Sequence, residues 1–389
     1  MPDSIELMLN YHQQSGHYPG AVVHIEKSGE ILSRQQSGRC GPDPQAQPVT
    51  EQARFRIASL TKPMVSLVAM RLIEQGLVSL ETPVAEVLPE LADLKPAADA
   101  HGSALPTVQP TIRHLLTHTA GFMYAPEIRS DTLRKAALDA GLGKMSGMSR
   151  SAFLAALGSI ALVAQPGTRF LYGYSTDVLG LVIERLAKQD LEQAMKTLLF
   201  EPLGMTRSGF RADPDEYADM PRAFDTDQAW HRFYDSFESV ERSLKERSEQ
   251  QGADPAQAPL LSGGGGLVST LDDVVLFARA LANRTQVGGG ELLSAPYFEQ
   301  MVSNHLPDSA DGPNGFIGSG WGFGLGGAVR HPTGAAAVPA NPGEFTWSGV
   351  TGQSLFVDPS TGWFAIMLSS NTASRVMVRL EFRRAASLL

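Results

Sequence analysis

The stretch FRIASLTKP, residues 55–63, decides the fold of this chain of 389 residues. Ser59 and Lys62 stand three residues apart in it, and Pro63 follows directly. Because proline lacks an amide N–H, a helix tolerates it only near the start. Apolar residues then recur with a helical period, so we expect a helix over about 60–77 with Ser59 at its N-terminus.

Ser59 and Lys62 are candidates for a nucleophile and its base. Residues three apart lie on one helix face, so the lysine amine can reach the serine hydroxyl. The amine acts as a base only if burial or nearby positive charge lowers its pKa. The residue before a proline is biased away from helical dihedral angles, which leaves the local geometry of Lys62 open. The four-residue pattern alone also fits a helix-capping serine.

Strand patterns stand at both ends of the sequence. Residues 20–27 and 31–38 flank a turn at 28–30, and residues 352–358 and 363–370 flank a turn at 359–362; each pair is typical of an antiparallel hairpin. The fold class is therefore α/β (α+β), with a central antiparallel sheet built from both termini and flanked by helices.

The middle of the chain lacks these strand patterns. Residues 81–210 carry helical patterns, which predicts a helical lobe inserted into one catalytic unit spanning 1–389. The α/β lobe then comprises about 1–80 and 211–389. The polar, charge-rich stretch 211–260 is expected to be a surface excursion, and whether it covers the active site stays open.

Several further segments join FRIASLTKP in carrying a family resemblance. They are TIRHLLTHTAGF (111–122), PGTRFLYGYSTDVLG (166–180), LSGGGGLVST (261–270), WGFGLG (321–326) and WSGVTGQSLFVDP (347–359). In order and spacing, over roughly residues 18–372, they resemble the β-lactamase-like serine hydrolases. The similarity is greatest to the family VIII carboxylesterases, relatives of class C β-lactamases and DD-peptidases. It implies a serine β-lactamase/penicillin-binding-protein-like fold, with the active site between the sheet and the helical lobe.

The resemblance also implies a catalytic tyrosine. In such esterases it lies five residues before the Asp of a D-V-L-G stretch, which selects Tyr172, five residues before Asp177. Tyr174 then stands where β-lactamases have an asparagine, and we expect it to line the pocket. This departure argues against efficient β-lactam turnover.

A third element of the lactamases, K-T-G, corresponds here to Trp347-Ser348-Gly349, which resembles the W-G-G of the esterases. Without that lysine the site lacks the group that grips a substrate carboxylate, which favours a neutral, apolar substrate. The N–H of Val350 is expected to bind the oxyanion together with the N–H of Ser59. Gly349 should let the backbone approach closely.

Tyr124 is the remaining candidate for substrate binding. Together with Trp321 and Phe323 it is interpreted either as a wall of the acyl pocket or as ordinary core. The sequence does not decide between the two.

Other chemistries find little support. The net charge is -9 with no basic block, which argues against nucleic-acid or membrane binding. The single cysteine, Cys40, cannot form an internal disulfide. His114 and His118 lack a third ligand for a metal, and the glycine-rich stretches 263–266 and 322–327 are expected to be tight backbone turns. The α/β-hydrolase pentapeptide G-x-S-x-G does not occur.

The sequence therefore predicts a carboxylesterase that cleaves short-chain carboxylic esters through a Ser59 acyl-enzyme, with Lys62 and Tyr172 as general base and acid. Alternatives on the same scaffold are an acyltransferase, an amidase, a β-lactamase or a DD-peptidase. A non-catalytic binding module is the other class considered. No cofactor or metal is expected, and the partner is a small ester. An acidic start without an apolar run, and no stretch of about 18 apolar residues, favour a cytoplasmic protein. Monomer and homodimer both stay open.

Overall fold

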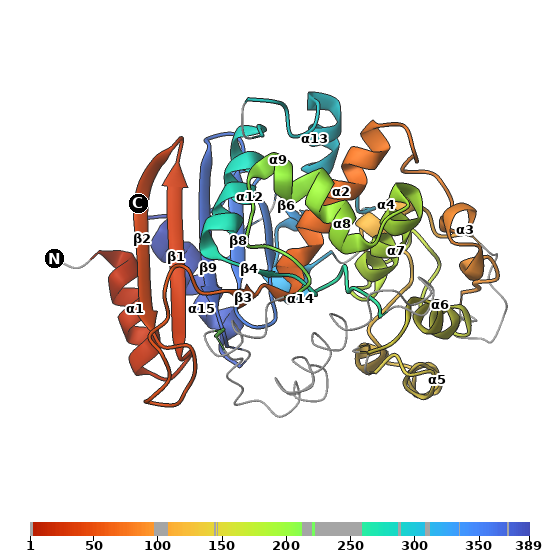
Figure 1. The fold of residues 1–389 in the computed structure, drawn as a ribbon, viewed down its shortest axis with the longest axis horizontal. Helices are drawn as coiled ribbons and strands as arrows, with labels where there is room; N and C mark the ends of the chain where they lie inside the picture. Colours follow the sequence, from red (N-terminus) through yellow and green to blue (C-terminus); the bar gives the residue numbers. More distant parts are fainter. Residues whose placement is uncertain are drawn as a thin grey trace.

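The computed structural model describes residues 3–96, 108–143, 145, 147–211, 220–221, 259–286, 289–307, 312–333, 335–371 and 373–389. At its centre is an antiparallel seven-stranded sheet with the strand order β2-β1-β9-β8-β7-β6-β5 (Figure 1). The strands are β1 (Gly20–Lys27), β2 (Glu30–Gly38), β5 (Trp321–Phe323), β6 (Ala328–Arg330), β7 (Phe345–Ser348), β8 (Ser354–Asp358) and β9 (Trp363–Ser369). Because β1 pairs with β9, both ends of the chain build one sheet, which confirms the predicted fold class.

Both predicted hairpins form. Ser28 and Gly29 connect β1 to β2, and both have positive φ angles, of 50° and 88°. Such angles at both central residues give a turn whose twist matches that of the strands it joins. The second hairpin joins β8 to β9 through residues 359–362.

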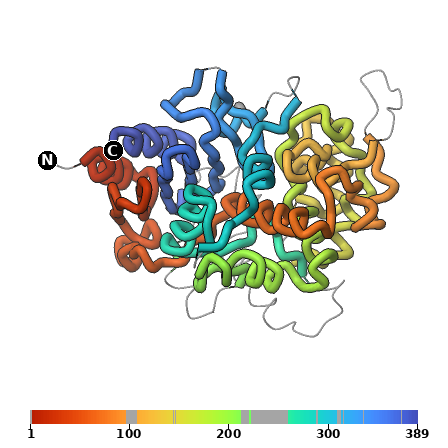
Figure 2. Tube along the Cα trace, turned by 90° about the horizontal axis from the view of Figure 1, so that it is seen from above, coloured from red at the N-terminus to blue at the C-terminus, as the bar shows by residue number. Residues whose placement is uncertain are grey.

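Successive side chains of a strand point to opposite faces of the sheet, and both faces are covered by other elements. On β1, Val23 packs with α1 (Ser4–Gln14) and α15 (Arg375–Ala386), whereas Val22 belongs to the large core on the opposite face. Helix α12 (Leu271–Asn283) contacts β1, β8 and β9. The N- and C-terminal helices lie side by side (Figure 2).

The remaining elements of the described chain are helices, apart from one short strand pair. The pair is β3 (Phe55–Arg56) with β4 (Val268–Ser269). The α-helices are α2 (Thr61–Glu74), α3 (Val84–Val87), α4 (Ile112–Leu116), α5 (Asp131–Asp139), α6 (Arg150–Gly158), α7 (Ser175–Ala187), α8 (Leu191–Met195), α9 (Glu201–Leu203), α13 (Ala295–Met301) and α14 (Asn314–Ile317). The tighter or wider turns are η1 (Ala58–Leu60), η2 (Pro89–Leu91), η3 (Ala125–Glu127) and η4 (Lys196–Phe200).

Every described strand lies outside 81–210, and the division into two lobes stays a prediction. The proposed excursion at 211–260 falls almost entirely outside the described residues. No helix among those described is long and apolar enough to cross a membrane.

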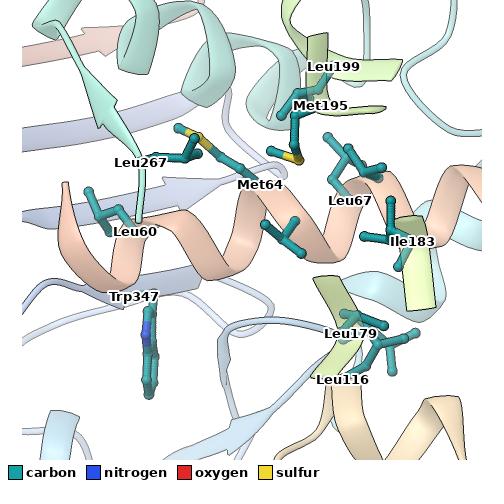
Figure 3. Packing of buried hydrophobic residues seen from close by; sticks show 14 of the residues in the cluster. Leu60, Met64, Leu67, Leu116, Leu179, Ile183, Met195, Leu199, Leu267 and Trp347 are labelled. Atoms are coloured by element: carbon teal, nitrogen blue, oxygen red, sulfur yellow. The ribbon is translucent and has the colours of Figure 1, made fainter. Parts of the chain in front are cut away.

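Helix α2 runs through the middle of the molecule. Twelve of its residues are buried, so apolar groups surround it on all sides. Leu60, just before it, and Met64 and Leu67 within it belong to the large core (Figure 3). Their neighbours in that view are Leu116, Leu179, Ile183, Met195, Leu199, Leu267 and Trp347. The helix that carries Lys62 is therefore held rigidly between the sheet and the other helices.

Candidate active site

Ser59 lies in the 3₁₀ turn η1, which directly precedes the first residue of α2, Thr61. Ala58 before it has a φ of 45°, in the left-handed region that residues with a side chain rarely adopt. Strain of this kind persists only where the surroundings enforce it, and it is frequent at functional sites. Lys62 is part of α2 despite the proline after it, which resolves the question the sequence left open.

Lys62 has three polar neighbours. Its Nζ lies 3.3 Å from Ser59 Oγ, 3.2 Å from the Tyr124 hydroxyl and 2.6 Å from the carbonyl oxygen of Gly264. A neutral amine has two N–H donors and one lone pair. If the carbonyl and the Tyr124 hydroxyl accept the two hydrogens, the lone pair faces Ser59, as a general base requires.

Burial shifts Lys62 toward this neutral form. Burial lowers the pKa of Lys62 to about 8, against the opposing effect of Asp177 and, more weakly, Glu127. Asp177 is itself buried, and burial raises its pKa. Its Oδ1 accepts hydrogen bonds from the Ser262 hydroxyl at 2.6 Å and from the Gly264 N–H at 3.1 Å. Gly264 thus bonds Asp177 through its N–H and Lys62 through its carbonyl oxygen.

The four-glycine run is the tight turn that the sequence predicted. The N–H groups of Gly265 and Gly266 both donate to the carbonyl of Ser262. A Cβ on Gly264 would come within 2.6 Å of Asp177 Oδ2, so only glycine brings this turn close to the carboxylate. The sequence identified the turn but not its contacts with Lys62 and Asp177.

Tyr172 is the third side chain of the group around Ser59. Its hydroxyl donates a hydrogen bond of 2.7 Å to Ser59 Oγ. Burial raises its pKa, partly opposed by the hydrogen bond to Ser59, so the side chain remains a phenol at neutral pH. Its ring centroid lies 4.9 Å from that of His118, 4.8 Å from Phe316 and 5.3 Å from Trp347. These aromatic contacts fix the direction of the hydroxyl.

Tyr174 is buried, and among the described residues no hydrogen bond joins its hydroxyl to Ser59 or Lys62; that it lines the pocket stays a prediction. Its hydroxyl donates to the carbonyl of Leu142 at 2.5 Å and accepts from the N–H of Ala125 at 3.0 Å. The ring lies edge-on to Tyr124, at a centroid distance of 4.9 Å. Helix α7 begins at Ser175, and the backbone turn before it directs Tyr172 and Tyr174 to different surroundings.

Trp347 and Gly349 lie beside these groups. Trp347 is buried under the Tyr172 ring and meets Phe323 edge-on at 5.2 Å. Gly349 begins the turn after β7, which closes through a hydrogen bond from the Gly352 N–H to the Gly349 carbonyl. The backbone hydrogen bonds of the described residues leave the N–H groups of Ser59 and Val350 without an acceptor. This agrees with the expected role of the two N–H groups in binding an oxyanion, which stays a prediction.

One cation near this strand was not found from the sequence. Arg379, on α15, donates hydrogen bonds to the hydroxyl of Ser348 and to the carbonyl of Phe316. Burial, with the nearby charge of Arg375, lowers the pKa of Arg379 to about 10. The sequence around Arg379 did not indicate this contact, because Arg379 belongs to a helix and lies 31 residues from Ser348.

The two histidines His114 and His118 have different surroundings. His114 accepts a hydrogen bond from the Thr111 N–H and thereby caps α4. Burial, and secondarily Lys62, hold the pKa of His118 well below its usual value, so it is neutral. Among the residues that the structure describes, no three metal-binding side chains come together.

The chain is similar to one protein family and to several known proteins. The family model described as Beta-lactamase matches residues 7–389. Esterase EstB of Burkholderia gladioli is 33% identical over 369 residues, which cover 91% of this chain and 86% of EstB. The solved structure of EstCE1, a hydrolase with promiscuous acyltransferase activity, superposes with a TM-score of 0.78 at 28% identity and covers 98% of this chain and 97% of its own. Simvastatin synthase (LovD) from Aspergillus terreus shares the fold, with a TM-score of 0.77 at 23% identity over 99% of this chain and 98% of LovD.

Proposed function

Because the chain belongs to the β-lactamase family, we propose that it is a serine carboxylesterase that hydrolyses short-chain carboxylic esters through an acyl-enzyme on Ser59. One observation carries the proposal. Ser59 Oγ lies within hydrogen-bonding distance of both Lys62 Nζ and the Tyr172 hydroxyl, and the pKa of Lys62 is lowered to about 8. The similarity to EstB and EstCE1 supports esters as the substrate class.

In acylation, Ser59 Oγ attacks the ester carbonyl carbon while its proton passes to neutral Lys62. The N–H groups of Ser59 and Val350 stabilise the oxyanion of the tetrahedral intermediate. As that intermediate collapses, the Tyr172 hydroxyl donates a proton to the departing alkoxide. The Lys62 ammonium then returns a proton to Tyr172. The products are the alcohol and an acyl ester of Ser59.

In deacylation, water takes the place of the alcohol. Lys62, with Tyr172, accepts its proton as the water oxygen attacks the acyl carbon, and the same N–H groups hold the oxyanion. Ser59 leaves with a proton returned by the pair, and the carboxylic acid is released. The enzyme thus returns to its starting state.

The surroundings of Ser59 favour an apolar substrate. Tyr172, whose hydroxyl bonds Ser59, packs its ring against Tyr124, Phe316 and Trp347, so aromatic rings gather beside Ser59. Such a lining suits an uncharged acyl or alcohol group. Short acyl chains remain the expectation from the family resemblance.

Acyl transfer to an alcohol is the second candidate. EstCE1 is described as a hydrolase with promiscuous acyltransferase activity, and the methylbutanoyltransferase of Aspergillus terreus that acts on monacolin J acid is 31% identical over 175 residues, 43% of this chain and 40% of that enzyme. An alcohol that replaces water in deacylation needs no additional catalytic group. A cytoplasmic location and the choice between monomer and homodimer stay predictions.

The test is hydrolysis of p-nitrophenyl acetate, butyrate and octanoate beside nitrocefin. We expect turnover of the esters, fastest for acetate and butyrate, with nitrocefin cleaved at least about 100-fold more slowly. Added short alcohols should yield a transesterified product if acyl transfer competes. Cleavage of nitrocefin alone would identify a β-lactamase instead, and absence of any acyl-enzyme by mass spectrometry would contradict the mechanism.

A pH profile tests Lys62 as the base. Since the neutral amine is the active form, kcat/KM should be low at acidic pH and rise to a plateau through a midpoint near 8. The negative charge of Asp177 raises the Lys62 pKa, so Asp177→Asn should move this midpoint to lower pH. Asparagine keeps an oxygen to accept from the Gly264 N–H, so the turn should persist.

Two further variants sharpen that measurement. Glu127→Gln should move the midpoint in the same direction by a smaller amount, since Glu127 is the weaker influence on Lys62. Glu30→Gln, at the exposed first residue of β2, serves as the control with an unchanged midpoint. A midpoint that stays in place or moves upward in Asp177→Asn would rule out the assigned electrostatics.

A further inference from the structure

We propose that Gln353 is a positioning residue that holds the two oxyanion-binding N–H groups at the right separation. This inference rests on the proposed esterase function and adds a residue with no contact to the reacting atoms. The donors, Ser59 and Val350, lie on segments almost 300 residues apart in the sequence, and no covalent link sets the distance between them.

The side chain of Gln353 joins these segments directly. It is 1% exposed, and its Nε2 donates to the carbonyl of Arg56 and to the carbonyl of Ser369, both at 2.8 Å. Arg56 lies three residues before Ser59, at the end of β3. The side-chain amide of Gln353 therefore links the segment that leads to Ser59 with the end of β9.

The same residue also shapes the turn that carries Val350. Its backbone carbonyl accepts from the Gly349 N–H at 2.9 Å, and its Oε1 accepts from the Thr351 hydroxyl at 2.8 Å. In the turn closed between Gly349 and Gly352, Val350 is the first central residue, whose N–H takes no part in the hydrogen bond that closes the turn. Gln353 thus contacts residues on both sides of Val350.

The packing leaves little room for another arrangement. A Cβ on Gly349 would lie 2.1 Å from Gln353 Oε1 and 3.0 Å from the carbonyl oxygen of Ile57. A Cβ on Gly352, whose φ is 96°, would lie 2.3 Å from Ser369 Oγ. The turn therefore sits directly against the nucleophile segment, and the buried amide fills the space between them.

Loss of these hydrogen bonds should misplace the Val350 N–H relative to Ser59. Displacement of a reacting group by about 1 Å can cost on the order of 100-fold in rate. Gln353→Met keeps the length of the side chain and removes all its hydrogen bonds. We expect kcat/KM for p-nitrophenyl acetate to fall about 10- to 100-fold, with KM changed less than about threefold.

A thionoester comparison separates positioning from general destabilisation. Sulfur is larger and a weaker acceptor than oxygen, so an oxyanion site contributes less to cleavage of p-nitrophenyl thionoacetate. Gln353→Met should therefore lose much more activity on the oxygen ester than on the thionoester. Leu9→Ala, which opens a cavity under α1 away from the site, is the destabilised control and should leave the ratio of the two rates unchanged.

Thr351→Val provides a milder variant should Gln353→Met fail to fold. It removes the hydroxyl that orients Gln353 Oε1, and we expect a three- to tenfold loss with the same preference against the oxygen ester. Equal losses on both esters, or no loss, in the variants that fold would overturn the inference while leaving the esterase proposal intact. Wild-type protein that cleaves neither ester would instead refute the proposed function.

Discussion

Ser59→Ala is expected to lower kcat/KM for p-nitrophenyl acetate by about 10⁴-fold or more, because the attacking oxygen is lost and the remaining N–H groups only bind the carbonyl. The variant should also fail to gain mass with a fluorophosphonate, which forms a covalent adduct with an activated serine. Ester hydrolysis followed at 405 nm and intact-protein mass spectrometry provide the two measurements.

Ser66→Ala is the matched control for this substitution. Ser66 is a buried serine within α2, seven residues after Ser59, and its hydroxyl has no hydrogen-bond partner among the described residues. It should retain nearly full activity and react with the probe. If Ser59→Ala keeps more than a tenth of wild-type activity, the nucleophile has been assigned to the wrong residue.

Tyr172→Phe should reduce kcat by about 10²- to 10⁴-fold, since the group that donates the proton to the leaving alkoxide is removed. The phenylalanine ring keeps the contacts with His118, Phe316 and Trp347, so KM and thermal stability should change little. Steady-state kinetics and thermal unfolding of the same preparations would check both halves of the prediction.

Tyr174→Phe is the informative counterpart, because the two tyrosines are neighbours in sequence with opposite expected phenotypes. Among the described residues its hydroxyl bonds the backbone of Leu142 and Ala125 alone, so the variant should lose about 1–3 kcal/mol of stability and keep most of its kcat. Tyr124→Phe should be intermediate, since it removes one acceptor from Lys62. A catalytic loss in Tyr174→Phe with full activity in Tyr172→Phe would exchange the roles we assign.

Much of the fold could be predicted from the sequence because its signals are local. The period-two strands and their turn residues specify both hairpins, and the apolar period around Pro63 specifies the helix that carries Lys62. The boundaries were less accurate: the helix expected over 60–77 begins with a 3₁₀ turn and ends at Glu74. Helix ends depend on caps and tertiary contacts that the apolar period does not record.

The spacing of residues in FRIASLTKP by itself determined that Ser59 and Lys62 could meet, because residues three apart on a helical turn share one face. Only the tertiary structure decided what surrounds them. Asp177 served in the sequence merely to locate Tyr172, yet its burial against Gly264 places a charge where it raises the Lys62 pKa. Tyr174 had the same apparent chemistry as Tyr172 and points elsewhere, and Gln353 bridges segments almost 300 residues apart. Hydrogen bonding and desolvation act through space, so these contacts depend on the packed chain rather than on the order of its residues.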